Sequence, residues 1–296
     1  MRTEKFKLRT QVRTLTDRLV TALAILATLT VIAPLVAIFV YLLYKGASSL
    51  NFAFFTQIPK PVGEKGGGMA NAILGSGILL GVASGIGVPI GIGAGIFLAE
   101  FGRGSKLAMG VRFTADVLNG VPSIVMGLTA YALLIAHKIP FLPFTGHFSA
   151  FSGGVALAIM MVPTVCRTTE EMLLMVPHAI REAALGLGVP TWRSVLSITV
   201  KTASPGIITG CMLAFARVAG ETAPLLFTAL GNQFWSSSLN ETIAALPLQI
   251  YVYALSPYDD WHRLAWAGSL VLIVLIVLAV SLVRWVTSRG VLKGAI

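Results

Sequence analysis

The sequence predicts an all-α polytopic membrane protein, built as one domain with six transmembrane helices. Of its 296 residues, 56% are hydrophobic and only 11% are charged, whereas soluble domains carry about 25% charged residues. The apolar residues fall in blocks long enough to cross a bilayer, which takes about 20 residues in a helix. The segments between these blocks hold most of the charged residues.

The six predicted transmembrane helices cover residues 19–43, 69–100, 113–136, 151–175, 203–230 and 264–286. The first block is too long for the apolar region of a signal peptide and has no clear cleavage site, so we expect an uncleaved helix after the basic segment 1–18. The last block leads into a basic tail at 287–296. Between the last two blocks, residues 231–262 are expected to form a solvated loop.

The second predicted helix is rich in glycine and contains two rows with four-residue spacing. The rows are Gly77, Gly81 and Gly85, and Gly87, Gly91 and Gly95. Such spacing places glycines on one helix face, where another helix can approach closely in a membrane. We therefore expect both rows to serve helix packing.

The distribution of lysine and arginine predicts that both termini are cytoplasmic. With six crossings, the basic residues on one side are Arg2, Lys5, Lys7, Arg9, Arg13, Arg18, Arg103, Lys106, Arg112, Arg181, Arg193, Lys201, Arg284, Arg289 and Lys293. Those on the other side are Lys45, Lys60, Lys65, Lys138 and Arg263. The richer side is the cytoplasmic one. The net charge of +10 is therefore a signal of topology and does not indicate a nucleic-acid partner.

Catalytic and metal-binding motifs are absent from the sequence. We find no Ser/His/Asp grouping, no paired-carboxylate cleft and no Gly-Lys-Ser/Thr of a nucleotide-binding loop. The two cysteines, Cys166 and Cys211, lack metal-ligand spacing and are expected to be small buried hydrophobes. The sequence predicts a non-enzymatic chain with no bound cofactor and no metal.

The fifth apolar block is unusual because it contains Arg217 and Glu221. Each charge near the centre of a bilayer costs roughly 2.5–3.5 kcal/mol. Four-residue spacing places the two side chains on one face of a helix. Either they form a permanent ion pair between helices, or they face a wet cavity in which an oxyanion displaces Glu221 from the guanidinium. Gly220 and Pro224 are expected to loosen the helix here.

Polar residues in the third and fourth predicted helices have two interpretations. Asp116 and Asn119 are expected to join helices, with lining of a polar path as the alternative. Arg167 either anchors its helix at the cytoplasmic interface or places a second positive charge near the cytoplasmic end of a path. Two arginines along a pore favour an anion over a cation.

The segment 177–201 is predicted to be a cytoplasmic docking element. Pro177 can start a short helix and Gly188 can end it. We expect Ala183 and Ala184 to allow close approach of a partner, and Leu185 to anchor it, together with Leu187 and Trp192.

Glu182-Ala183-Ala184, followed by Gly188, resembles the EAA loop of ABC importer permeases. In that family the loop is the coupling helix that enters a groove of the ATPase subunit. The family's closing proline is missing from Ile198-Thr199-Val200-Lys201, which leaves the end of the loop undefined. The stretches 66–72, 162–170 and 217–235 narrow the resemblance to the PstA family, the permease subunits of bacterial phosphate importers, over about residues 66–285.

The resemblance implies a type I ABC importer permease fold in a bacterial inner membrane. It implies three kinds of partner: a related permease subunit (PstC-like), an ATPase dimer that uses ATP (PstB-like) and a periplasmic phosphate-binding protein (PstS-like). Arg217, Glu221 and Arg167 would line the phosphate path, and Glu182, Ala183, Ala184, Leu185 and Gly188 would contact the ATPase. The loop 231–262 would form part of the outer gate or of the surface that faces the binding protein.

The function expected from the sequence is ATP-driven import of inorganic phosphate. The closest alternative is the same architecture carrying sulfate, molybdate or a phosphonate. A less favoured alternative is a secondary transporter that uses Arg217 and Glu221 as a proton relay, against which the docking element argues.

Overall fold

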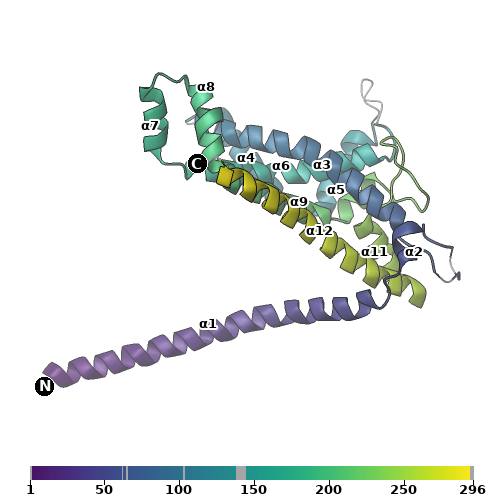
Figure 1. Ribbon diagram of the computed structural model, residues 1–296, viewed down its shortest axis with the longest axis horizontal. Coiled ribbons are helices and arrows are strands. Elements are labelled where there is room, and N and C mark those ends of the chain that lie inside the picture. The colour runs from purple at the N-terminus through teal and green to yellow at the C-terminus, as the bar shows by residue number, and fades with distance from the viewer. Residues whose placement is uncertain (1, 62, 65, 103, 138–144, 294–296) are drawn as a thin grey trace.

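The computed structural model describes residues 2–61, 63–64, 66–102, 104–137 and 145–293, which form a bundle of long helices with one helix diverging from it (Figure 1). Lys65, Arg103 and Lys138, which contribute to the predicted topology, lie outside the described residues, as do the last residues of the basic tail.

Five helical spans in the described part of the chain are long and apolar enough to cross a membrane. Four of them confirm predicted blocks, and the remaining one matches the block 203–230 only in part, because it begins at Thr191, inside the predicted docking element 177–201, and ends at Ala219. The first span is Arg13–Ala47 within α1 (Arg2–Ala47), and the second, Ala70–Phe101, consists of α3 (Ala70–Ile96) and the π-helix η1 (Phe97–Phe101). The third is α6 (Ala150–Leu174), and the last is Asp259–Thr287 within α12 (Asp259–Lys293). Between these two, Thr191–Ala219 consists of α8 (Thr191–Ser194), the π-helix η2 (Val195–Thr199) and α9 (Val200–Ala219).

The third predicted helix is not one straight helix. It consists of α4 (Lys106–Gly120) and α5 (Ser123–Leu134), which meet at 115°. Val121 and Pro122 between them are extended, because the ring of a proline disfavours helical geometry in the residue before it. Counted as one bent span, the pair brings the number of candidate spans to six.

The fifth predicted helix, residues 203–230, is also broken. α9 ends at Ala219 with Gly220 as its C-cap, and α10 (Ala223–Thr228) begins with Pro224 in its first turn. Proline lacks the amide proton that a continuing helix would need there. The expected loosening at Gly220 and Pro224 is thus confirmed as a complete break.

The loop 231–262 is less solvated than predicted. Its middle section, residues 243–248, is buried, and it continues into α11 (Leu246–Ala254). The Leu246 amide donates to Ser76 Oγ at 2.7 Å, and Asn71 Nδ2 donates to the Asn232 carbonyl at 2.9 Å. These bonds hold the segment against the start of α3, because buried backbone groups need partners.

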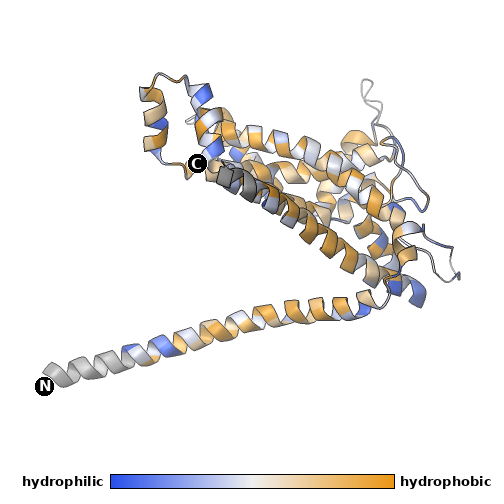
Figure 2. Cartoon of the chain, viewed as in Figure 1, coloured by the Kyte–Doolittle hydropathy of each residue, from blue (hydrophilic) through white to orange (hydrophobic). Residues whose placement is uncertain are grey.

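The long helices run between two ends of the molecule (Figure 1). The start of α1, the end of α12 and the pair α7 (His178–Gly186) and α8 lie toward one end, while α2 (Phe52–Thr56) and α11 lie at the other. Figure 2 shows apolar residues along the helices between these ends. α1 meets α12 where Tyr41 and Trp266 stack edge to face at 5.2 Å, and its apolar side chains from residue 13 to 41 are exposed.

The most extensive helix contact joins α3 and α6. The second glycine row lies at this contact: a β-carbon at Gly91 would stand 2.6 Å from Val165 Cβ, and one at Gly95 would stand 2.6 Å from Thr169 Cβ. The close packing expected of this row is therefore confirmed. A β-carbon at Gly77, Gly81 or Gly85 would meet nothing within 4 Å, so within this chain the first row does not serve packing.

This difference predicts unequal effects of alanine at matched positions of α3. Gly91→Ala should lower stability by about 1–3 kcal/mol, because the added methyl forces Val165 or the backbone to move. Gly81→Ala should not lower it, because its methyl enters open space. The check is the fraction of each purified variant that stays monodisperse in detergent after heating; equal losses in the two variants would contradict the packing.

Candidate functional site

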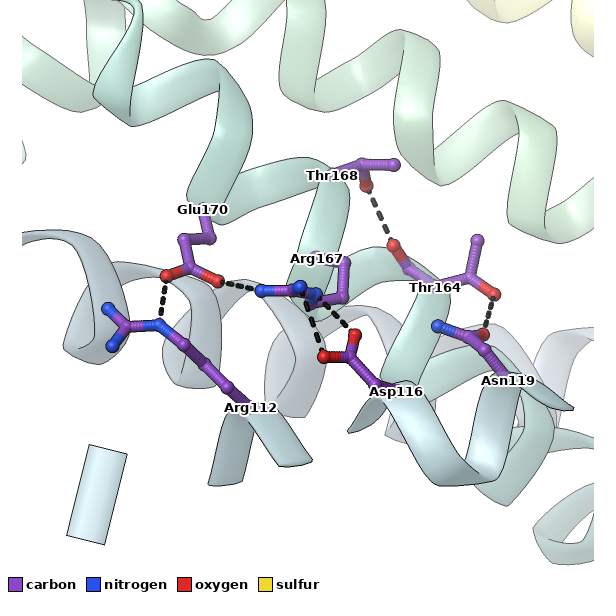
Figure 3. Close-up of polar contacts among 7 residues, drawn as sticks. All are labelled: Arg112, Asp116, Asn119, Thr164, Arg167, Thr168 and Glu170. Atoms are coloured by element: carbon purple, nitrogen blue, oxygen red, sulfur yellow. Dashed lines mark hydrogen bonds and ion pairs between the residues drawn. The ribbon is translucent and has the colours of Figure 1, made fainter. Parts of the chain in front are cut away.

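Four charged side chains of α4 and α6 form a line of alternating sign (Figure 3). Arg112 Nε lies 2.6 Å from Glu170 Oε1, and Glu170 Oε2 lies 2.8 Å from Arg167 Nη1. Arg167 Nε lies 2.8 Å from Asp116 Oδ1. The line joins two helices and balances two positive charges with two negative ones.

Glu170 is the buried centre of this line, with only 4% of its side chain exposed. Its two carboxylate oxygens accept from two different arginines. A buried carboxylate is stable only when it is paired and hydrogen-bonded. Glu170 therefore fixes where Arg112 and Arg167 can lie.

Asp116 and Arg167 form the open end of the line. Arg167 donates to both Asp116 oxygens, at 2.8 Å from Nε and 3.2 Å from Nη2, which is the forked geometry suited to a carboxylate or a phosphate. The side chains are 53% and 31% exposed. Asp116 is thus the exposed partner of Arg167, while Glu170 is enclosed.

The expected helix-joining role of Asp116 and Asn119 is confirmed. Asp116 on α4 pairs with Arg167 on α6, and Asn119 Oδ1 accepts from Thr164 Oγ1 at 3.1 Å. Arg167 itself pairs with Asp116 on α4 and with Glu170 on its own helix.

Arg217 and Glu221 do not form the predicted pair. Arg217 lies in the last turn of α9, and Glu221 lies beyond the helix end, where its amide donates to the Val218 carbonyl at 3.1 Å. The spacing of four residues predicts a shared face only if the helix continues, and Gly220 ends it. Among the described residues, ion pairs within 4.0 Å include neither side chain, and the Arg217 residue is exposed.

The helix of the docking element begins and ends as predicted. Pro177 is the N-cap of α7, and Gly188 takes a left-handed φ of 78° just after it. The Gly188 amide donates to the Leu185 carbonyl at 2.9 Å, and the Val189 amide donates to the Ala184 carbonyl at 3.2 Å. These two bonds form a Schellman motif, which favours glycine at the left-handed position.

The predicted contact residues of α7 do not all face outward. Glu182, Ala183, Leu185 and Gly188 are exposed, but Ala184 is 3% exposed and packs within this chain. Within this chain Ala184 is thus covered, and the other four predicted contact residues are the exposed ones. Exposed apolar side chains in this region are Leu185, Leu187, Trp192 and Leu196.

Arg181 fixes α7 to the membrane helices and was missed as a functional residue. Its Nη2 lies 2.8 Å from Glu100 Oε1 on η1, with 12% and 8% of the two side chains exposed. It also donates to the carbonyls of Leu173 and Val176 at the end of α6, at 2.6 and 2.9 Å. Cations near a helix C-terminus are favoured by the free carbonyls and the helix dipole.

The spacing of charged residues in α4 and α6 is a weak sequence signal for the ion pairs of Arg112, Arg167 and Glu170. Glu170 lies three residues after Arg167, and Asp116 lies four residues after Arg112, so charged residues recur on single helix faces. From sequence alone, Arg112 and Arg181 indicate only the cytoplasmic side. In the described residues, no group of three or more His, Cys, Asp or Glu side chains is placed to hold a metal ion.

Comparison with known proteins identifies the family. Residues 91–290 match the model of the binding-protein-dependent transport system inner membrane components. The phosphate transport system permease protein PstA of Yersinia pestis is 49% identical over 245 residues, covering 83% of this chain and 81% of that protein. PstA of Pasteurella multocida is 45% identical over 270 residues, covering 91% and 93%.

The fold also matches a solved transporter. An inward-facing structure of the MetNI methionine ABC transporter aligns with a TM-score of 0.58 and 19% identity, covering 76% of this chain and 96% of that chain. This likeness confirms the ABC importer permease fold, in the helical architecture described above. The chain therefore belongs to the binding-protein-dependent transport system inner membrane components and, among them, to the PstA family of phosphate transport permeases.

Proposed function

We propose that this permease, a non-catalytic multi-pass protein of the inner membrane, forms half of the path by which inorganic phosphate is imported at the expense of ATP. The observation that carries the proposal is the exposed Arg217 at a helix break, without an ion pair in the described part of the chain. A guanidinium offers a planar fork that matches the oxygens of phosphate.

The two arginines suit two successive positions along such a path. α9 runs away from α8, so Arg217 in its last turn is remote from the docking element. Arg167 lies seven residues before the end of α6, toward α7. Phosphate would meet Arg217 first and then replace Asp116 at Arg167. Glu221, in the break beside Arg217, is the carboxylate nearest in sequence to compete with the anion.

The exposed surfaces fit the partners expected of an importer. The glycines of the first α3 row and the apolar side chains of α1 are available to a second, PstC-like permease. α7, with Glu182 and Leu185 exposed, would enter a PstB-like ATPase dimer, which supplies the hydrolysis of ATP. Phe234 and Trp235 are exposed at the opposite end, where a PstS-like binding protein would deliver phosphate.

The orientation follows from the positions of the basic residues. The end that carries α7 and α8 also holds Lys106, Arg193 and Lys201, and by the positive-inside rule we infer that this end and both termini face the cytoplasm. ATP-driven closure of the ATPase dimer would then move α7 and open the cavity outward, and hydrolysis would return it to the inward-facing state.

Arg217→Ala should reduce phosphate uptake at least about 30-fold, because a charged binding partner is lost, while the complex still assembles. Arg217→Lys should retain part of the activity, since it keeps the charge and loses the fork. The measurement is uptake of labelled phosphate by proteoliposomes containing the complete transporter. Lys201→Ala, which removes an exposed cation from the same helix, is the matched control. Normal uptake by Arg217→Ala would remove Arg217 from the path.

Glu182→Lys should weaken association with the ATPase, because it reverses an exposed charge on α7. Co-purification of the ATPase with the permease measures this directly. Asp259→Lys, an equal charge reversal on an exposed residue at the opposite end of the molecule, should leave the association unchanged. If Glu182→Lys retains both the ATPase and transport, α7 is not the docking helix.

A further inference from the structure

We propose that the π-helix η1 transmits a movement of α7 to Arg167 in the line of charges, with Glu100 and Arg112 as positioning residues. This inference rests on the proposed function, because it assumes that α7 docks on an ATPase and that Arg167 meets the anion. It adds a physical route between these two places, through residues to which the proposed function assigns no role.

The first link of the route joins α7 to η1. Arg181 on α7 and Glu100 on η1 pair at 2.8 Å and are almost fully enclosed. Arg181 is also bonded to the Leu173 and Val176 carbonyls. Because an enclosed ion pair is strongly disfavoured when its partners separate, a shift of α7 moves Glu100 with it.

The second link joins η1 to α4 and depends on the π-helical geometry. The Gly102 amide donates to the Phe97 carbonyl, five residues back, at 2.6 Å. In an α-helix it would donate to Leu98, four residues back. The Leu98 carbonyl instead accepts from Arg112 Nη2 at 2.9 Å. The wider π-helical turn thus leaves a main-chain carbonyl of η1 free to accept a hydrogen bond from the Arg112 side chain of α4. Such turns occur frequently at functional sites.

The third link is the line of charges already described. Arg112 Nε bonds to Glu170, and Glu170 bonds to Arg167. The route therefore runs without interruption from α7 through η1 and α4 to Arg167 on α6. Each step is a direct hydrogen bond or ion pair of 2.9 Å or less.

Packing makes η1 able to transmit a displacement. Leu98 and Ala99 of η1 are fully buried. Leu98 packs with Ala108 of α4 and Cys166 of α6, and Ala99 packs with Leu173 of α6. Close-packed interiors are nearly incompressible, so η1 shifts as a unit. A shift that draws Arg112 away from Glu170 leaves Glu170 to bind Arg167 more tightly, and a return releases Arg167 toward the exposed Asp116 and the anion.

The test is the number of phosphate ions imported per ATP hydrolysed by the complete transporter in proteoliposomes, with its partner permease, ATPase and binding protein. Glu100→Gln keeps the size of the side chain and removes its charge. The double variant Glu100→Gln/Arg181→Met removes the pair without leaving a lone buried charge. We expect both to assemble and hydrolyse ATP while the import ratio falls at least about tenfold. Glu171→Gln, which neutralises an exposed carboxylate beside Glu170, should keep the wild-type ratio.

A double-mutant cycle separates a route from two independent defects. Arg112→Lys keeps the charge and loses one of the two contacts of the guanidinium. If Glu100 and Arg112 act on one route, the variant carrying both changes should have the import ratio of the worse single variant. The inference would be overturned if the import ratio of the variant carrying both changes fell by the product of the two single losses. It would also be overturned if the Glu100 variants kept an import ratio within about twofold of wild type.

Failure of the proposed function is distinguishable in the same experiment. If the wild-type transporter imports sulfate or another oxyanion with ATP and does not import phosphate, the phosphate assignment fails. The ratio measured with that anion then still tests the route. If wild type imports phosphate and the Glu100 variants do so with an unchanged ratio, only the route fails.

Discussion

The carboxylate of Glu170 lies inside an apolar helix bundle, and both of its oxygens are bonded to arginines. Removing one partner of a buried ion pair typically costs about 3–5 kcal/mol, so the contacts of both arginines with Glu170 are strongly favoured. This constraint orders α4 against α6 and holds Arg167 where its outer face pairs with Asp116. The second position of the proposed path depends on that arrangement, because an anion would bind Arg167 there by exchange with Asp116.

Helix breaks supply the second physical feature of the site. In a bilayer, backbone groups outside regular helices are tolerated only where protein or water satisfies them. The bend at Val121 and Pro122 interrupts one candidate span, and the break at Gly220 ends another. The second break lies one turn from Arg217, so a polar environment that suits free backbone groups also suits an unpaired guanidinium. The same reasoning makes the packed segment 243–248 part of the bundle end that carries α2 and α11, and it is not a free loop.

The elements that could be predicted from sequence are those set by local chemistry. The length of the apolar blocks predicted the spans, and Pro177 and Gly188 predicted the limits of α7. The motif that begins at Arg217 predicted the family. Contacts between distant residues could not be predicted, since they depend on which helix faces meet. The spacing of Arg217 and Glu221 predicted a pair because a continuous helix was assumed. Arg112 and Arg181 were counted as charges of a loop, although each lies in an ion pair with a carboxylate of another helix. The burial of Ala184 could not be predicted either, because a sequence motif does not show which side of its helix is covered.

ATP-dependent uptake of labelled phosphate by proteoliposomes containing this chain and its partner subunits tests the central claim most directly. Unlabelled phosphate and sulfate are added as competitors in separate samples. The account predicts uptake only when ATP is present, and competition by phosphate but not by sulfate. Uptake that proceeds without ATP or without the ATPase, or that sulfate suppresses as strongly as phosphate does, would contradict it.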